Sequence, residues 1–231
     1  MSPALGLAGR TNPSGAGEAG HIRPHSSRHP MVPSFAPCFP FSLLGLLHQE
    51  EFVFLDIETL GLHTEPLILV GLARLRGGEI TVTHLIVRAI HEEIPVLSLL
   101  GEELAGVKAL VTYNGRAFDV NFIEARLRYY GLPGNVDQPN FDLLPFARRQ
   151  FREFLPDCRL ETVEKVLSVQ RAIDIPSALV PEFYLDYLRE RNVGPLVAII
   201  EHNRQDLLSL ALLLRKFWTE LVVRGLSGAP S

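Results

Sequence analysis

The first strong hydrophobic run of this chain covers residues 52–57 and reads Phe-Val-Phe-Leu-Asp-Ile. Successive side chains of a strand point to opposite faces, so this run would be apolar on both. We therefore predict a central strand that is covered on both sides. Two further runs, 67–75 and 80–87, are separated by Arg-Gly-Gly-Glu at 76–79, and Gly-Gly between apolar runs is typical of a hairpin. The three runs predict an antiparallel meander.

After residue 90 the pattern alternates between helix and strand. We expect helices and short strands in the order helix 95–104, strand 109–112, helix 118–130, strand 141–144 and helix 145–151, followed by helices at 160–167, 182–191 and 195–222. A strand that follows a helix must cross back to join the first strand in parallel. The order therefore predicts an α/β fold with a mixed five-stranded sheet, three antiparallel strands followed by two parallel ones, and helices on both faces.

The first 48 residues lack this periodicity. Prolines recur through residues 1–40 among many Gly, Ser and His residues. Such a segment cannot bury enough apolar surface to offset the entropy lost on ordering. We predict a disordered or poorly ordered extension over 1–48, one folded domain over 49–222, and a flexible tail over 223–231.

The overall charge narrows the choice of partner. The chain has a formal net charge of −4, so no global basic field attracts a polyanion. Contact with nucleic acid would have to be local or bridged by metal. Cys38 and Cys158 are the only cysteines, and one lies in the expected extension, so a disulfide scaffold is not expected and a reducing compartment is favoured. We find no apolar stretch long enough for a membrane span and no signal-peptide pattern, and we expect a cytoplasmic protein with no membrane partner.

The candidate chemistry begins where the first strand ends, at Asp56 and Glu58. Residues two apart on a strand point the same way, so the two carboxylates would lie side by side. Like charges in that position are unfavourable unless a cation lies between them. Taken alone, the pair is also compatible with a solvated strand end, and its interpretation depends on other acidic positions.

Two more carboxylates fit the same site. Asp119 falls in the first turn of an expected helix, where it would serve either as a cap or as an anion favoured by the helix dipole. Asp206 lies in the long last helix among apolar neighbours, with His202 four residues earlier on the same face. A buried carboxylate is costly unless it is paired or bound to metal. The alternative is a simple His202–Asp206 pair at the helix surface.

Carboxylate oxygens are the ligands that Mg²⁺ and Mn²⁺ prefer, and a Cys/His ligand set for structural zinc is missing. Two such ions about 4 Å apart can clamp the attacking and leaving oxygens of a phosphodiester displacement. His202 would then be placed to accept a proton from the attacking water. We therefore predict a site for two Mg²⁺ or Mn²⁺ ions.

With these residues in this order, the sequence resembles the DEDD, or DnaQ-like, 3′–5′ exonucleases of the ribonuclease-H-like superfamily. The matching motifs are Asp56-Ile57-Glu58-Thr59, Asn114-Gly115-Arg116-Ala117-Phe118-Asp119 and His202-Asn203-Arg204-Gln205-Asp206. The YprB-like ribonuclease-H-like domains are the more specific resemblance, over about residues 50–216. Their further matches are Phe141-Asp142-Leu143-Leu144, Leu155–Thr162, Asp174-Ile175-Pro176-Ser177 and Val180-Pro181-Glu182.

The resemblance implies a role for each matching position. Asp56 would bridge both metals, Glu58 and Asp206 would complete the first metal site, and Asp119 would hold the second. Thr59 and Leu60 would line the slot for the terminal nucleotide. From their position in the second motif, we also predict that Asn114 and Arg116 contact the substrate. Asp142 would cap the following helix.

The spacing of His202 departs from both branches of that family. In the His-type branch the His precedes the last Asp by five residues, and in the Tyr-type branch a Tyr precedes it by four. Here a His precedes Asp206 by four. His202 is thus either a general base or an orienting group.

Several arginines near the motifs are candidate phosphate contacts, although a solvated surface position is the more common role for each, with Arg116 the best exception by position. They are Arg116, Arg148, Arg149, Arg152 and Arg204. Our main hypothesis is a 3′–5′ exonuclease acting on single-stranded DNA or RNA. The alternatives are a non-catalytic nucleic-acid-binding module and an endonuclease acting on hybrids. The sequence predicts no oligomeric state.

Overall fold

The computed structural model describes residues 49–62, 65–134, 136–171 and 175–227. These residues all belong to one compact unit, Ser34–Ser231. The expected extension over 1–48 and the end of the expected tail, 228–231, lie outside the described residues. Among the helices of the described chain, none combines the length and apolar character that crossing a bilayer requires.

The predicted five-stranded mixed sheet is confirmed. Its strands are β1 (Phe52–Thr59), β2 (Leu67–Arg76), β3 (Glu79–Ile86), β4 (Ala109–Thr112) and β5 (Asn140–Asp142). Their order in the sheet is β3-β2-β1-β4-β5. The β1–β2 and β2–β3 pairs are antiparallel, and the β1–β4 and β4–β5 pairs are parallel. Strand β1 is therefore central, with the hairpin on one side and the two crossover strands on the other.

The helices follow the expected order. They are α1 (Glu93–Leu104), α2 (Asp119–Tyr130), α3 (Leu144–Phe151), α4 (Leu160–Val166), α5 (Val180–Glu190) and α6 (Val193–Ser227), with short 3₁₀ turns at Gln49–Glu51, Ile90–Glu92 and Ser177–Leu179. Two predicted boundaries were wrong. Helix α6 ends at Ser227 rather than near residue 222, and the last strand ends at Asp142 because Leu144 already begins α3.

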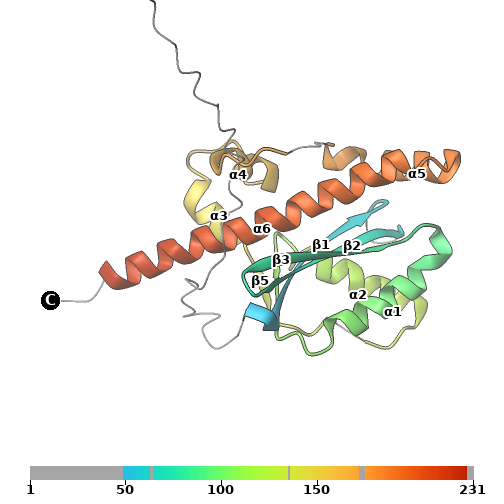
Figure 1. Cartoon of the computed structure of the whole chain (residues 1–231), viewed down its shortest axis with the longest axis horizontal. Helices are drawn as coiled ribbons and strands as arrows, with labels where there is room; N and C mark the ends of the chain where they lie inside the picture. The colour runs from blue at the N-terminus through green and yellow to red at the C-terminus, as the bar shows by residue number, and fades with distance from the viewer. Residues whose placement is uncertain (1–48, 63–64, 135, 172–174, 228–231) are drawn as a thin grey trace, which may run out of the picture. The chain divides into compact units, whose positions relative to one another are not determined.

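The two faces of β1 enter two different hydrophobic cores. Val53 and Leu55 pack with residues of α1 and α2, whereas Phe52 and Phe54 pack with residues of α3, α4 and α6. Figure 1 shows α6 crossing one face of the sheet, with α1 and α2 on the other. The apolar residues on both faces of this strand therefore reflect burial on both sides.

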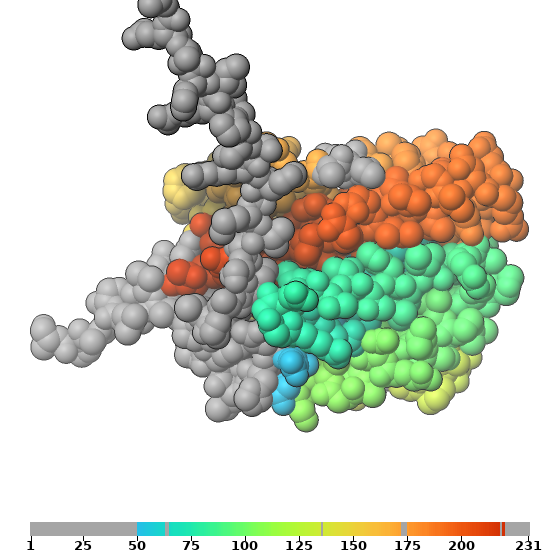
Figure 2. Space-filling view, in the orientation of Figure 1, coloured from blue at the N-terminus to red at the C-terminus, as the bar shows by residue number. Residues whose placement is uncertain are grey.

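Helix α6 runs over the strands that carry the first motif. It contacts β1, β2 and β3, and α5 packs beside it over Ile68 and Leu69 of β2. In Figure 2 the side chains of α6 lie against those of β3, so the helix reaches the edge of the sheet. Because α6 crosses β1, the third motif, residues 202–206, lies next to the first motif at the end of β1.

Candidate active site

The close approach of α6 to the sheet depends on a glycine. Gly71 of β2 is the register partner of Asp56, and a Cβ at Gly71 would lie 1.8 Å from Oδ1 of Asn203. Only a residue without a side chain leaves room for that amide. Nδ2 of Asn203 donates to Oδ2 of Asp56 at 2.7 Å, a contact between residues 147 apart in sequence. The amide therefore fixes the carboxylate of Asp56 against the helix.

Asp119 is tied to the same strand from the opposite direction. It begins α2, and its Oδ1 accepts a hydrogen bond from the backbone N–H of Ile57 at 3.1 Å. Ile57 stands between Asp56 and Glu58, so this bond brings Asp119 to the strand segment that carries the first two carboxylates. Asp119 is 5% exposed. Asp119 is therefore not a helix cap at the surface.

The third motif completes the arrangement from α6. Ligand atoms of Glu58, His202 and Asp206 lie within 4.8 Å of one another, the one such group of His, Cys, Asp and Glu found among the described residues. Nε2 of His202 lies 3.7 Å from Oδ2 of Asp206. The structure therefore brings together Glu58, His202 and Asp206 most closely, with Asp56 and Asp119 beside them. The expected alternative of a His202–Asp206 pair at the helix surface does not describe this buried histidine, which is 3% exposed.

An arginine outside all three motifs enters the cluster. The guanidinium of Arg171 donates to Oδ1 of Asp206, and its Nη1 lies 3.1 Å from Nδ1 of His202. Its other edge donates to both oxygens of Glu164, from Nε at 2.7 Å and from Nη2 at 2.8 Å. The Arg171 and Glu164 side chains are 7% and 4% exposed. One buried guanidinium thus serves two carboxylates and an imidazole.

The four buried carboxylates of this site carry more negative charge than the nearby positive groups balance. Burial, followed by the charges of neighbouring carboxylates, raises the pKa of Asp56 and of Glu58 well above the ordinary value. Burial also raises the pKa of Asp119 to about 7. The pKa of Asp206 rises to about 7 by burial, although Arg171 opposes that shift. Clustered, buried carboxylate oxygens with raised pKa values fit a divalent cation, which would stabilise the ionised forms.

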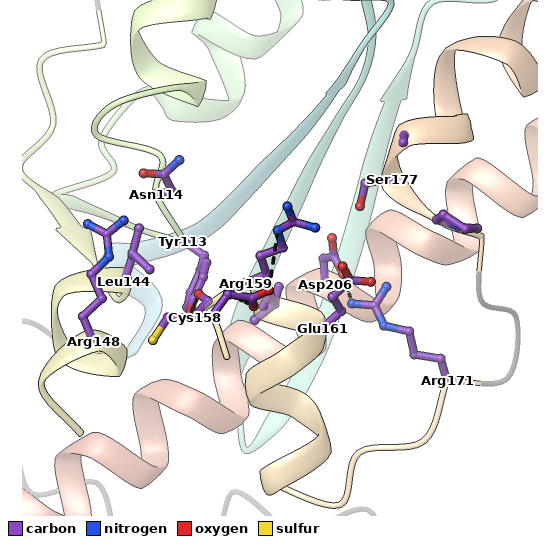
Figure 3. Close-up of a pocket in the computed structure, with 14 residues that line it drawn as sticks. Tyr113, Asn114, Leu144, Arg148, Cys158, Arg159, Glu161, Arg171, Ser177 and Asp206 are labelled. Atoms are coloured by element: carbon purple, nitrogen blue, oxygen red, sulfur yellow. Dashed lines mark hydrogen bonds and ion pairs between the residues drawn. The ribbon is translucent and has the colours of Figure 1, made fainter. Parts of the chain in front are cut away.

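A cavity of about 570 Å³ opens beside Asp206. Figure 3 shows Arg171 and Asp206 pointing toward one another at its edge, and the Arg148 side chain on the far side. Its wall also includes Tyr113, whose hydroxyl donates to the backbone carbonyl of Cys158 at 2.6 Å. This volume suits a nucleotide-sized ligand.

The predicted substrate residues follow the carboxyl ends of two neighbouring parallel strands, β1 and β4. Thr59 and Leu60 directly follow Glu58, and Oγ1 of Thr59 donates to the carbonyl of Gly61 at 2.8 Å. Asn114 lines the cavity with a left-handed backbone, φ 63°. The backbone amides of Asn114 and Arg116 donate to Asp142 at 2.8 and 3.3 Å.

Asp142 has the structural role implied by the resemblance. Besides the turn amides of the second motif, its Oδ1 accepts from the backbone N–H of Leu144, the first residue of α3, at 3.0 Å. This carboxylate therefore joins the second motif to the start of the next helix. Asp174, which belongs to another matched segment, lies outside the described residues.

The candidate phosphate-binding arginines fall into different environments. Arg204 is paired with Glu201, and Arg149 lies over the ring of Phe146 at 4.6 Å. Arg148 lines the cavity beside Asp206. Arg116 and Arg152 are exposed. Arg148 and Arg116 therefore remain the better candidates for a strand that approaches the cluster.

Sequence reasoning missed four residues that shape this site: Arg171, Glu164, Asn203 and Gly71. Two of them had a usable signal. A glycine within a strand often marks a close backbone approach, and Asn203 directly follows His202 in the third motif. Arg171 and Glu164 had none, because Arg171 meets His202 and Asp206 only across 31 and 35 residues of sequence.

Comparison with known proteins places this fold and site in a family. The RNase_H superfamily profile (RNase_H_2) matches residues 53–218, and the chain belongs to this superfamily. A protein similar in sequence is the uncharacterized protein YprB of Bacillus subtilis (strain 168), with 34% identity over 170 residues. That match covers 71% of this chain but only 41% of YprB.

A similar solved structure is the family B DNA polymerase from the hyperthermophilic archaeon Pyrobaculum calidifontis. It superposes with a TM-score of 0.53 at 17% sequence identity, over 71% of this chain and 24% of the polymerase. This likeness supports the fold. Together with the profile match, it confirms the predicted ribonuclease-H-like architecture.

Proposed function

We propose that this chain is a metal-dependent 3′–5′ exonuclease that hydrolyses phosphodiester bonds at single-stranded ends of DNA or RNA, with two Mg²⁺ or Mn²⁺ ions. One observation carries the proposal. Glu58 of a central strand and His202 and Asp206 of a distant helix converge within 4.8 Å, beside Asp56. Buried carboxylates in such a group are costly unless a cation neutralises them.

The four carboxylates would hold the metal ions. Asp56 would bridge both, Glu58 and Asp206 would complete one site, and Asp119 would contribute to the other. Bound divalent ions supply an activated water and stabilise the charge on the leaving oxygen. The protein's own part is to hold those oxygens in place, through Asn203 on Asp56 and the Ile57 amide on Asp119.

The bond changes follow from the substrate. The water oxygen bonds to the terminal phosphorus, and the bond from that phosphorus to the 3′ oxygen breaks. The products are a nucleoside 5′-monophosphate and a strand shortened by one nucleotide with a new 3′ hydroxyl. Thr59 and Leu60 would line the slot of the terminal nucleotide, and Asn114 and Arg116 would position the strand through its backbone.

Membership of the RNase H superfamily supports nuclease chemistry, and the polymerase relative, named for DNA, supports a nucleic-acid substrate. A second candidate is a non-catalytic nucleic-acid-binding module. The contact of Arg171 with Asp206 favours it in one respect, because the guanidinium reduces the repulsion that a phosphate would meet.

End-labelled single-stranded oligonucleotides test the proposal. With Mg²⁺ or Mn²⁺ we expect stepwise shortening from the 3′ end, release of nucleoside monophosphates and inhibition by EDTA. Asp56→Asn should lower the rate on the order of 10³-fold, because it removes several kcal/mol of metal-mediated charge stabilisation. Asp137→Asn, a matched change at an exposed carboxylate, should retain the wild-type rate.

The same assay separates the alternatives. A circular substrate has no end, so cleavage of a circle or of an RNA–DNA hybrid at internal positions would identify an endonuclease. Binding that persists in EDTA, without cleavage of any substrate, would identify a binding module. Equal rates for wild type and Asp56→Asn would show that the cluster is not the catalytic centre.

A further inference from the structure

Arg171 is held by a partner that lies outside the carboxylate cluster. Both oxygens of Glu164 accept from its guanidinium, in the two-bond geometry that makes arginine–carboxylate pairs specific. Glu164 belongs to α4 and is 3% exposed. The pair balances its own charge, so Arg171 keeps a buried counterion whatever binds to Asp206. The guanidinium is therefore a built element of the site.

The protonation of Arg171 is equally fixed. An arginine side chain is not deprotonated in proteins, and Arg171 is paired with Glu164 and Asp206. A guanidinium has N–H donors and no acceptor. Every nitrogen or oxygen that it contacts must accept a hydrogen bond.

This property decides which nitrogen of His202 carries the proton. Nδ1 lies 3.1 Å from Nη1 of Arg171, so Nδ1 must present its lone pair there. A neutral imidazole with Nδ1 as acceptor carries its hydrogen on Nε2. Nε2 lies 3.3 Å from Oγ of Ser177, which can accept that N–H, and 3.7 Å from Oδ2 of Asp206, which is beyond hydrogen-bond distance. Neither ring nitrogen then offers a lone pair to a water or a metal.

We propose that Arg171 is a positioning residue that fixes His202 as an Nε2–H hydrogen-bond donor and occupies Oδ1 of Asp206, which leaves Oδ2 of Asp206 for a metal. His202 is thereby an orienting donor to an oxygen of the substrate or the attacking water, and not the acceptor of the water's proton. The catalytic part of this inference rests on the proposed nuclease function. The assignment of the tautomer does not.

The response of the Arg171 contacts to Mg²⁺ distinguishes a positioning role from a simple substitute for a metal ion. If the guanidinium only takes the place of a metal ion, Mg²⁺ should displace it from Asp206 and His202. If it positions them, both contacts should persist when Mg²⁺ is bound. The state of the His202 ring with and without Mg²⁺ separates these two roles.

The experiment is ¹H–¹⁵N correlation spectroscopy of full-length protein labelled with ¹⁵N-histidine, which reports the protonation of each ring nitrogen. The chain has eight histidines, and His202→Gln assigns the signals of His202. We expect an unprotonated, hydrogen-bonded Nδ1 and a protonated Nε2, both in EDTA and at saturating Mg²⁺. In Arg171→Met the fixed tautomer should be lost under both conditions.

Two further variants control this result. Arg171→Lys keeps the positive charge but lacks the planar guanidinium with its paired N–H donors, so it should not restore the fixed tautomer of His202. Arg148→Met removes another arginine of the same cavity and should leave the His202 signals unchanged. If Arg171→Met does not fold because Glu164 is left unpaired, the double variant Glu164→Gln/Arg171→Met removes both charges and gives the same readout.

A protonated Nδ1 in the wild type would overturn the proposal, as would rescue of the tautomer by Arg171→Lys. Identical spectra for wild type and Arg171→Met after Mg²⁺ addition would show that the guanidinium only stands in for metal. In cleavage assays, Arg171→Met should lower kcat about 10- to 100-fold with little change in KM. Absence of cleavage in the wild type would contradict the proposed function, while the metal-free spectra would still decide the tautomer.

Discussion

Two buried acidic centres of this molecule handle their charge in opposite ways. Glu93 of α1 is fully buried and has a complete set of partners. Arg126 donates to both of its oxygens at 2.6 Å, and the hydroxyl of Tyr130 and the amide of Leu67 donate at 2.8 and 2.9 Å. One carboxylate is matched by one guanidinium. This centre joins α1, α2 and the start of β2, and its role is structural.

The carboxylate cluster beside α6 is not matched in this way. Arg171 already pairs with Glu164 and adds only one contact to Asp206. The pKa values of all four carboxylates are raised by burial, and neighbouring carboxylates add to the shift. A balanced buried ion pair thus indicates a structural role, whereas an excess of buried carboxylates indicates a site for a cation. The members of the cluster are Asp56, Glu58, Asp119 and Asp206.

The largest effect on stability is expected at the balanced centre. Arg126→Met leaves Glu93 buried without its counterion and should lower the free energy of unfolding by about 3–5 kcal/mol. Urea denaturation measures this, and Mg²⁺ should not restore the loss. Arg128→Met, on the same helix but in an exposed pair with Glu124, should cost less than about 0.5 kcal/mol. Equal effects of the two variants would contradict the comparison.

An intermediate effect is expected where α6 meets the sheet. Gly71→Ala places a Cβ against Asn203, so it should destabilise the protein by about 1–3 kcal/mol and weaken Mg²⁺ binding by displacing the amide that holds Asp56. Gly101→Ala, in α1 with open space around it, should be neutral or stabilising. Calorimetric Mg²⁺ titration and urea denaturation test both changes. Unchanged Mg²⁺ affinity in Gly71→Ala would separate Asn203 from the metal site.

An effect of the opposite sign is expected at Asp119. Its folded pKa of about 7 exceeds the ordinary 3.8, so its stabilising contribution is complete below pH 3.8 and is lost as the pH rises through 7. Asp119→Asn has no such proton to lose. In EDTA at pH 8 we expect it to be more stable than the wild type, and this difference should shrink toward pH 4. Urea denaturation at both pH values measures it, and a less stable variant at pH 8 would contradict an excess of negative charge.

The sequence allowed the order of strands and helices to be predicted because each element carries a strong local period. Alternation placed Asp56 and Glu58 on one face of β1, and the four-residue spacing placed His202 and Asp206 on one face of α6. Contacts between elements were beyond such patterns. Arg171 reaches Asp206 across 35 residues and Asn203 reaches Asp56 across 147, and no local period encodes either distance.

The central claim is that the excess of buried carboxylates marks a site for divalent metal. Anomalous diffraction from a crystal of the wild-type protein soaked in Mn²⁺ tests it most directly. We predict two manganese peaks among the oxygens of Asp56, Glu58, Asp119 and Asp206, with Arg171 still bound to Glu164. A fully soaked crystal with no peak among these four residues would contradict the account.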